Sequence, residues 1–523
     1  MWKKLLITGC VTFSLLSGGT LSAQPSCEIK EEVTSEQLDR TQKELVAMMK
    51  ELKNDSYFQT ELDKAAVQSS LSKRMAAYKD LTVRLLSVLE IQAELEWMKP
   101  EAIQEALGIM KKSSGFDAVL ADKRFGELKS LLAGGFDGIY TGDAQAIDKA
   151  NKTLTLKRKL MLMSPDVNVD KMLTVKFDLG ERANFVGAGS LGIQPNNWSN
   201  LSSASRKNFK AQLVELSGLQ SGELSEKVLY KPAVDGSSVT DLVLNWDGKR
   251  LMFTALDTTR RWQVHELDIN NGEAKQVTNI PEPDLEFFDG TYLPDGRMLA
   301  ISNIGYQGVP CVNGSDAVGN MVLYDPSNGY LRRLTFDQDA NWHPVVMANG
   351  KVMYVRWEYT DLTHYFSRIV MHMNPDGTEQ KSLYGSGSMF PNSIFDVQPL
   401  PKHTNRFVGV ISGHHGVARS GRLMIFDPAK SRKEEKGMIQ ELPFRGRPII
   451  PEVKDELVNG VWPQFIKPYP LTDETFLVTA KLSPYSRWGI YLVDIYDNLT
   501  LVANADDAGM IYSVPVKSTP IPP

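Results

Sequence analysis

Residues 341–380 read NWHPVVMANGKVMYVRWEYTDLTHYFSRIVMHMNPDGTEQ, and residues 389–422 read MFPNSIFDVQPLPKHTNRFVGVISGHHGVARSGR. Short apolar or aromatic runs, such as 351–356 and 406–412, alternate here with turn sequences, which is the pattern of β-strands joined by tight hairpins. Charged and imidazole side chains fall only in certain gaps between these runs. The stretch therefore predicts antiparallel strands whose chemically active groups gather in particular loops.

Turn sequences recur at regular intervals from about residue 171 onward. The first set falls at residues 246–248, 294–296, 348–350, 401–403 and 472–474, and a second set falls at 270–272, 327–329 and 375–377. A spacing of roughly 50 to 70 residues is typical of four-stranded propeller blades enlarged by loops. A degenerate further blade is expected at 173–229, with strands at 184–187 and 212–216 and with residues 510–514 closing the ring. We therefore predict a mainly β protein, a six-bladed β-propeller over residues 170–516.

The composition changes abruptly before this region. Residues 31–165 contain only Pro100 and Pro165 as prolines and carry Leu, Ala and Met at three- and four-residue spacing, which predicts amphipathic helices. Residues 57–98 fit one long helix or two, and their apolar face, from Leu81 to Ile91 with Val83 included, needs a partner helix. We expect an α-helical N-terminal domain packed on the propeller. A coiled-coil dimerisation arm is the alternative, although sustained heptads are absent.

The first 23 residues have the pattern of a signal peptide. Lys3 and Lys4 precede an apolar stretch at residues 5–16, and residues 21–23 form a small-residue cleavage site. No later stretch is long and apolar enough to predict a transmembrane span. We therefore expect export to the periplasm or cell envelope. A lipid anchor at Cys27 stays open, because the residues before it fit a lipoprotein motif poorly.

Composition and motifs exclude several classes of function. A net charge of −5 and a pI near 5.9 argue against nucleic-acid binding, which needs a clustered basic face. Only Cys27 and Cys311 remain after signal removal, so a disulfide framework is excluded and at most one bond between them is open. The motif Cys-x-x-Cys-His is absent, so this chain encodes no covalent c-type haem site. Hydrolase, P-loop and zincin motifs are absent as well.

Several motifs, taken in order, carry a resemblance to a known family. They are GYQGVPC at 305–311, LTFDQD at 334–339, RWEYTD at 356–361, HMNPDG at 372–377, GHHGVAR at 413–419 and WGIYLVD at 488–494. Over residues 160–520 the chain resembles the middle domain of the hydrazine synthase alpha subunit and its relatives. The resemblance implies a six-bladed, TolB-like propeller and a metal near it, which draws attention to Cys311 and His343. It does not imply hydrazine synthesis, because that enzyme depends on c-type haems and partner subunits.

Propeller topology sorts the polar residues by face. Turns joining strands one and two, or three and four, lie on one face, called here the turn face; loops joining strands two and three, or successive blades, lie on the other, called the loop face. The candidate ligand-binding residues expected on the loop face are Glu358, Asp361, His414, His415, Arg419 and Arg487. The candidate metal ligands expected there are Cys311, His343 and His364, with Asp316 nearby.

The chemistry of these candidates has two interpretations. A thiolate, imidazoles and carboxylates from separate loops suit zinc with an open position for Lewis-acid chemistry. Hydrogen-bonded structural loops are the alternative, because no short metal spacing occurs and His414 and His415 can bond backbone carbonyls. Arg419 suits either a carboxylate or phosphate ligand or a buried ion pair.

Two functions from different classes follow. The first, which the sequence favours, is a non-enzymatic exported propeller that binds a small ligand or a protein partner through its loop face. The second is a metal-dependent enzyme that uses Cys311 with His343 or His364, related to hydrazine synthase without being one.

Overall fold

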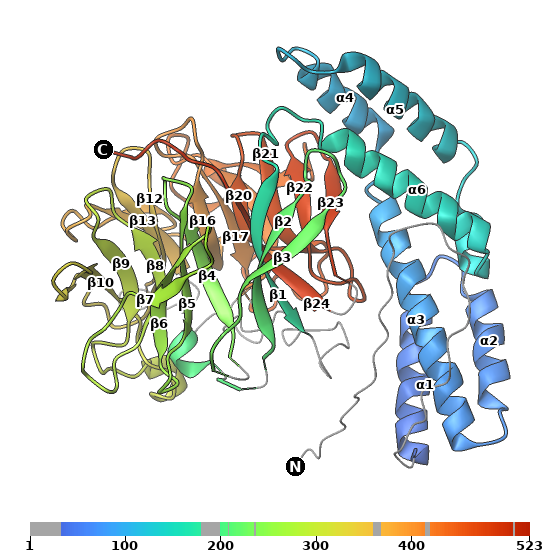
Figure 1. The fold of residues 1–523 in the computed structure, drawn as a ribbon, viewed down its shortest axis with the longest axis horizontal. Helices are drawn as coiled ribbons and strands as arrows, with labels where there is room; N and C mark the ends of the chain where they lie inside the picture. Colours follow the sequence, from blue (N-terminus) through green and yellow to red (C-terminus); the bar gives the residue numbers. More distant parts are fainter. Residues whose placement is uncertain are drawn as a thin grey trace.

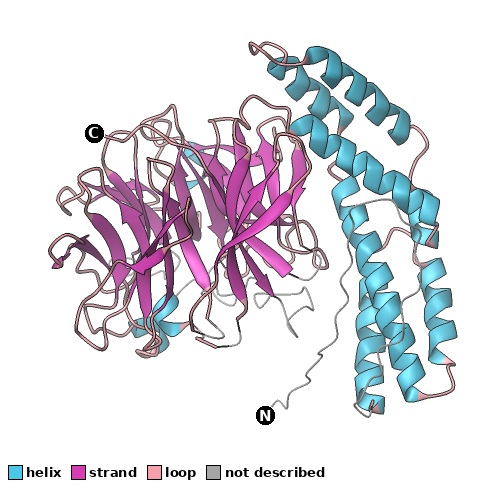
Figure 2. Cartoon of the chain, in the orientation of Figure 1, coloured by secondary structure: helices cyan, strands magenta, loops and turns pink. Residues whose placement is uncertain are grey.

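The structure is a computed structural model that describes residues 33–178, 199–204, 206–207, 209–234, 237–358, 368–413, 419–505 and 508–523, except the side chain of Cys311. The expected signal peptide, Cys27 and the expected strand at 184–187 lie outside these residues. The described chain consists of helices followed by strands, and the helices gather at one side of the strand region (Figures 1 and 2). None of these helices is long and apolar enough to cross a membrane.

The described residues form six α-helices before the first strand. They are α1 (Ser35–Met49), α2 (Ser56–Ala66), α3 (Leu71–Leu95), α4 (Pro100–Met110), α5 (Ala118–Leu132) and α6 (Ala144–Met161). Residues 57–98 thus form two helices, because the chain leaves α2 at Val67 and the Ser70 hydroxyl accepts a hydrogen bond from the backbone N–H of Lys73 to begin α3. Thr34 and Gln37 form a reciprocal capping box at α1.

The apolar face of α3 is covered by helices of the same chain. Leu81, Leu85 and Val88 are buried in a cluster to which α1, α2 and α6 contribute, with Leu45 and Phe58 among its members. The expectation that Val83 belongs to this face is wrong. Val83 is 61% exposed, because a position two residues after Leu81 faces roughly the opposite side of a helix.

The strands form six antiparallel four-stranded units. In pairing order they are β24 (Ala508–Pro515), β1 (Lys171–Asp178), β2 (Ala211–Ser217), β3 (Ser225–Tyr230); β4 (Val239–Leu244), β5 (Arg250–Leu256), β6 (Trp262–Asp268), β7 (Ala274–Gln276); β8 (Phe287–Tyr292), β9 (Met298–Ser302), β10 (Asn320–Asp325), β11 (Tyr330–Arg333); β12 (Asn341–Val346), β13 (Val352–Trp357), β14 (Arg368–Met373), β15 (Lys381–Tyr384); β16 (Ser393–Pro399), β17 (Phe407–Ser412), β18 (Arg422–Phe426), β19 (Met438–Leu442); and β20 (Gln464–Pro470), β21 (Thr475–Lys481), β22 (Gly489–Asp494), β23 (Leu499–Ala503). One parallel pairing, Arg368 with Ser393, joins the fourth and fifth units into one sheet.

All the predicted turn sequences join the strands as expected. Residues 246–248 and 294–296, for example, connect the first and second strands of their units, and 270–272 connects β6 to β7. Gly248 has φ +70° and a β-carbon there would lie 2.8 Å from the backbone of Lys517, so this turn requires glycine both for conformation and for space.

The first strands of the six units contact one another in sequence order. β4, β8, β12, β16 and β20 each contact the next, β20 contacts β24, and β24 contacts β4. β24 also pairs with β1 along its length, from Met172 with Pro515 to Asp178 with Ala508, so the end of the chain completes the unit begun by its first strand. Figure 1 shows β24 beside β1 although they are far apart in sequence.

Charged side chains join the helices to the sixth strand unit and to the connection between β19 and β20 that leads into it. Arg487 contacts Glu90 of α3 with Nε–Oε1 2.6 Å and Nη2–Oε2 2.5 Å, and Arg445 makes a similar two-point contact with Glu105 of α4. Lys157 of α6, 2% exposed, donates hydrogen bonds to the carbonyl oxygens of Trp97 (2.6 Å) and Leu499 (2.7 Å).

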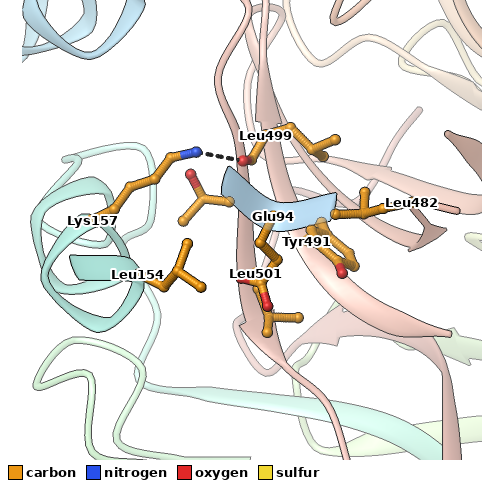
Figure 3. A pocket seen from close by; sticks show the side chains of 8 residues that line it. Glu94, Leu154, Lys157, Leu482, Tyr491, Leu499 and Leu501 are labelled. Atoms are coloured by element: carbon orange, nitrogen blue, oxygen red, sulfur yellow. Dashed lines mark hydrogen bonds between the residues drawn. The ribbon is translucent and has the colours of Figure 1, made fainter. Parts of the chain in front are cut away.

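Glu94 lies beside this junction at a small cavity of about 10 Å³. Lys157, Tyr491 and Thr500 line the same cavity, and Figure 3 shows the side chains of Glu94 and Lys157 there. The volume suits a single water molecule. Burial raises the pKa of Glu94 to about 7, against the opposing charge of Arg158.

Glu94→Gln is expected to remove a pH dependence of stability. Between the ordinary pKa of 4.5 and the folded value of about 7, the folded state binds more protons, so the wild-type free energy of unfolding falls as pH rises. The variant has no ionisable group at position 94. Its free energy of unfolding is expected to exceed that of wild type by about 1–3 kcal/mol at pH 8, with little difference near pH 4.5. Urea unfolding at both pH values measures this. Glu96→Gln, on the exposed end of α3, is the matched control; an equal gain at both pH values would contradict the prediction.

Candidate functional site

One residue in the first strand of each unit adopts a left-handed backbone conformation. These residues, called here the axial ring, are Asp241 (φ 56°), Asp289 (φ 53°), His343 (φ 54°), Asp396 (φ 50°), Lys467 (φ 50°) and Tyr512 (φ 72°). In every unit the pairing with the second strand shifts register at this residue, as in a β-bulge. The bulge re-aims one polar side chain out of each apolar strand, so the six units bring six polar groups together.

Hydrogen bonds run around the axial ring from one unit to the next. The backbone N–H groups donate as follows: Asp241 to Tyr512 Oη (2.7 Å), Asp289 to Asp241 Oδ2 (3.0 Å), His343 to Asp289 Oδ2 (2.5 Å) and Lys467 to Asp396 Oδ2 (3.0 Å). An ammonium group cannot accept a hydrogen bond. The N–H of Tyr512, which follows Lys467 in the ring, accordingly donates to Thr479 Oγ1 at 3.1 Å.

Opposite charges also meet within the axial ring. Lys467 Nζ lies 2.8 Å from Asp396 Oδ1. His343 lies between two carboxylates, with Nδ1 3.4 Å from Asp289 Oδ2 and Nε2 3.3 Å from Asp396 Oδ1. The Lys467 ammonium also lies 5.4 Å from the centre of the Tyr512 ring. These contacts hold the ring together electrostatically.

The charges of the axial ring set each other's ionisation. Burial alone would raise the pKa of Asp289, but His343 and Lys467 outweigh it and hold the pKa at about 2. Burial likewise opposes the ionised form of Asp396, yet Lys467 and His343 lower its pKa. The pKa of Lys467 is raised because Asp396, Tyr512 and Asp241 outweigh burial. Burial and the charge of Asp289 raise the pKa of Asp241.

Arg419 reaches the axial ring from the loop between β17 and β18. It is 4% exposed, and its guanidinium lies 4.7 Å from the ring centre of Trp342 and 4.9 Å from that of Phe395, the residues that precede His343 and Asp396. Its Nη2 donates to the carbonyl oxygen of Ser199. Burial lowers the pKa of Arg419 to about 10, partly offset by the charges of Asp396 and Asp289. Arg419 therefore stays a cation at neutral pH, within electrostatic range of the ring carboxylates of Asp396, Asp289 and Asp241.

The structure brings two of the predicted site residues together, His343 and Arg419. Arg487 lies apart from them on Glu90 of α3. Glu358 directly follows β13 and is half-buried. Asp361, His364, His414 and His415 lie outside the described residues.

The predicted zinc site is only partly described. Cys311 lies in a short 3-10 segment, Pro310–Val312, but its side chain and all of His364 are outside the described residues. His343, whose side chain is described, has Nδ1 3.4 Å from Asp289 Oδ2 and Nε2 3.3 Å from Asp396 Oδ1. Within the described residues no group of three or more His, Cys, Asp or Glu side chains could hold one. Zinc bound through Cys311 and His364 stays a prediction.

Sequence reasoning missed five members of the axial ring. They are Asp241, Asp289, Asp396, Lys467 and Tyr512. A usable signal is nevertheless present: in five of the six first strands a large apolar residue directly precedes the ring residue, as in Phe288-Asp289, Phe395-Asp396 and Ile466-Lys467. Polar residues that recur at the equivalent position of each repeat, inside strands that are otherwise apolar, indicate that these residues lie together in the folded protein.

The chain has relatives of similar fold among solved structures, although no family model and no curated protein matches it. Hydrazine synthase from Kuenenia stuttgartiensis is similar with a TM-score of 0.51 and 14% identity, covering 70% of this chain and 49% of that chain. TolB from Acinetobacter baumannii is similar with a TM-score of 0.40 and 11% identity, covering 70% of this chain and 72% of that chain. This chain thus spans about half the length of the hydrazine synthase chain. At such identities the first likeness bears on the fold alone, and it supports a β-propeller type of fold.

Proposed function

We propose that this chain is an exported six-bladed β-propeller that binds a small polar ligand of no net charge at the axial ring, from the loop face. The six four-stranded units and the contact of β24 with β4 support six blades in a closed ring. The observation that carries the binding function is the axial ring itself.

Backbone conformation favours a functional rather than a structural ring. Six of the twelve described non-glycine residues with positive φ belong to it. Each such conformation costs about 1 kcal/mol or more, and strain of this kind concentrates at binding and catalytic sites. Replacing buried ion pairs by apolar residues is often neutral or stabilising, so stability alone gives little reason to keep three carboxylates, a lysine and a histidine here.

Charge balance defines the class of ligand. Apart from His343, which lies between Asp289 and Asp396, the ring and Arg419 carry two anions and two cations: the pKa values of Asp289 and Asp396 are lowered, the raised pKa of Asp241 favours its uncharged form, and Lys467 and Arg419 are cationic. A ligand with net charge would leave an uncompensated charge in a buried site, which is costly. A neutral or zwitterionic ligand with several hydrogen-bonding groups leaves the balance intact.

Access is proposed from the loop face. Arg419 belongs to a connection between second and third strands, and its guanidinium lies within electrostatic range of three ring carboxylates. Longer connections such as 303–319 lie on this face, whereas tight turns such as 246–248 occupy the other. Arg419 is therefore the residue placed to contact both ligand and ring.

Thermal unfolding with four probes tests the proposal. Glucose and glycine betaine represent ligands of no net charge, and citrate and putrescine represent charged ones. At least one of the first two is expected to raise Tm by about 2 °C or more at saturating concentration, and citrate and putrescine are not. Arg419→Lys keeps the positive charge but lacks the planar guanidinium group with its several N–H donors. The substitution is expected to abolish the rise in Tm. Arg297→Lys, paired with Asp295 on the turn face, is the matched control and should keep it.

Three outcomes would contradict the proposal. They are no shift with either uncharged probe, an equal shift with citrate or putrescine, and an unchanged shift in Arg419→Lys. If a protein partner binds while none of the small molecules raises Tm, the result would instead favour a loop face that binds a protein.

The remaining assignments belong to the same proposal. We infer a signal peptide at 1–23, a helical domain at 31–165 and a propeller at 170–516 related to the hydrazine synthase alpha middle domain. The amino-acid composition of residues 1–23 supports export, and the mass of the protein recovered after secretion tests it. A mass corresponding to an uncleaved chain would contradict the signal peptide.

A further inference from the structure

A cavity of about 520 Å³ lies on the turn face, between the second and third strand units. Its lining comes from the β4–β5, β8–β9 and β10–β11 turns and from the outer strand β7. The segment after β24 completes it: the backbone N–H of Thr519 donates to the carbonyl oxygen of Trp246 (2.9 Å), and Ile521 lines the cavity. Ligand cavities of proteins have volumes of about 300–1,000 Å³, so this one has room for a small organic molecule.

Aromatic and sulfur-containing side chains contribute to the lining of this cavity. They are Trp246, Tyr292, Met252 and Met298. Trp246 is half-buried, so other parts of the chain cover its indole only in part. Aromatic rings pack favourably on one another in offset or edge-to-face arrangements, and methionine sulfur makes favourable contacts with ring edges. These side chains therefore suit a ligand whose apolar part is an aromatic ring.

Three cations and one carboxylate of the described residues line the same cavity, and the carboxylate is already engaged. The cations are Arg250, Lys275 and Arg297, and the carboxylate is Glu266. Tyr292 Oη donates to Glu266 Oε2 at 3.1 Å. Arg250 Nη1 lies 3.6 Å from Oε2, and Lys275 Nζ lies 3.3 Å from Oε1. Burial and the Glu266 carboxylate raise the pKa of Tyr292, so its hydroxyl keeps the proton that it donates.

The two arginines retain N–H groups for a ligand. Arg250 donates through Nε to Asp247 Oδ2 (2.8 Å). Arg297 donates through Nε and Nη2 to Asp295 Oδ2 (2.8 and 2.5 Å). Neither aspartate is part of the described lining. Since a guanidinium group carries five N–H donors, each arginine has donors that no hydrogen bond occupies within the described residues. A ligand must supply acceptors for them, and a planar carboxylate matches a guanidinium in shape and charge.

We propose that this cavity binds small aromatic monocarboxylates. The aromatic ring lies beside Trp246, and the carboxylate accepts hydrogen bonds from the cations that line the cavity. Glu266 and the two aspartates that pair with the arginines offset most of the positive charge, so a polyanion without apolar surface, such as citrate, does not fit. The site differs from the axial ring in its face of the molecule and in its ligand. It goes beyond the function proposed for the axial ring and does not depend on it.

Isothermal titration calorimetry on the full chain at pH 7 tests the proposal. The probes are 2-naphthoate and 2-naphthalenemethanol, which have the same ring system but differ in charge. One 2-naphthoate is expected to bind per chain with a Kd on the order of 0.1 mM. The alcohol is expected to bind at least about tenfold more weakly, because it lacks the carboxylate. Excess glucose or glycine betaine should leave the Kd of 2-naphthoate unchanged, because the two sites are separate.

Three variants identify the groups that bind the carboxylate. Arg297→Met is expected to weaken 2-naphthoate binding by about fivefold to tenfold. Lys249→Met is the matched control, because Lys249 is exposed in the β4–β5 connection and is not part of the described lining, yet the substitution removes the same charge. Glu266→Gln removes the lining carboxylate and releases Arg250 and Lys275, so it is expected to tighten binding by about threefold. A misfolded variant cannot show such a gain.

Four results would overturn the proposal. They are the absence of 2-naphthoate binding, equal affinity for 2-naphthalenemethanol, equal losses in Arg297→Met and Lys249→Met, and displacement of 2-naphthoate by glucose or glycine betaine. Circular dichroism establishes that each variant folds, and weaker binding by folded Glu266→Gln would likewise exclude a carboxylate held by the cations. The readout is the affinity for an aromatic anion, so its failure is distinguishable from failure of the thermal shifts that test the axial ring.

Discussion

Lys467→Met is expected to lower the free energy of unfolding by about 3–5 kcal/mol. The substitution leaves the Asp396 carboxylate buried without the ammonium that lies 2.8 Å away, and an unpaired buried charge of this kind is strongly destabilising. Methionine has similar length and no branch, so the backbone strain at this position changes little. Equilibrium unfolding in urea at pH 7 measures the loss.

A double-mutant cycle identifies the cause of that loss. Lys467→Met/Asp396→Asn removes the uncompensated charge while keeping an acceptor for the backbone N–H of residue 467, and is expected to be more stable than Lys467→Met by about 1–3 kcal/mol. Lys351→Met, which removes a partly exposed partner of Glu379, is the matched control and should have a much smaller effect. A double variant as unstable as the sum of the two single variants would mean that the ion pair is not what stabilises the ring.

Lys157→Met is expected to lower stability by about 2–4 kcal/mol and to loosen the helices from the strands. The change removes two hydrogen bonds from a charged donor and leaves the carbonyl oxygens of Leu499, which is buried, and Trp97, which is part-buried, without this partner. Part of the loss is offset, because burial already lowers the pKa of Lys157 to about 8 and so disfavours its charged form. Hydrogen exchange should rise in α6 and β23 and stay unchanged in β8 and β12.

Lys152→Met on the same helix is the control for helix propensity and side-chain length. Lys152 pairs with Asp148 of α6, and its side chain is 68% exposed. Equal hydrogen exchange in the two variants would show that the junction does not depend on Lys157.

Local sequence was sufficient for the described strands and turns, but it left open whether residues 57–98 form one helix or two. The Asn-Gly and Asp-Gly pairs at residues 349–350 and 295–296 predict hairpin turns because those residues tolerate positive φ, and the turns form there. Apolar runs such as 407–411 predict buried strands for an equally local reason. Val83 shows the limit of this reasoning: an apolar residue inside a helical pattern still lies outside when its angular position faces away from the partner.

The candidate site depended on long-range geometry. His343 and Arg419 were predicted, but Asp241, Asp289 and Lys467 were not, because a residue inside an apolar strand gives no local sign that a bulge will turn it toward other units. Arg419 and Arg487 look alike in sequence, each in a polar loop of the expected loop face. One lies over the axial ring and the other pairs with Glu90, and only the packing of α3 on the strands separates them.

The stretch from residue 341 to 422 by itself determined where strands, turns and polar loops occur, since these follow from the side-chain period and turn chemistry of neighbouring residues. The tertiary structure alone decided which polar groups meet. Among the described residues, three buried lysines show the physical reason: Lys157 donates to carbonyl oxygens, Lys467 contacts a carboxylate, and Lys481 Nζ lies 5.5 Å from the centre of the Trp462 ring. The ionisation of a buried group depends on partners distant in sequence, so the charge state of these lysines is a property of the fold.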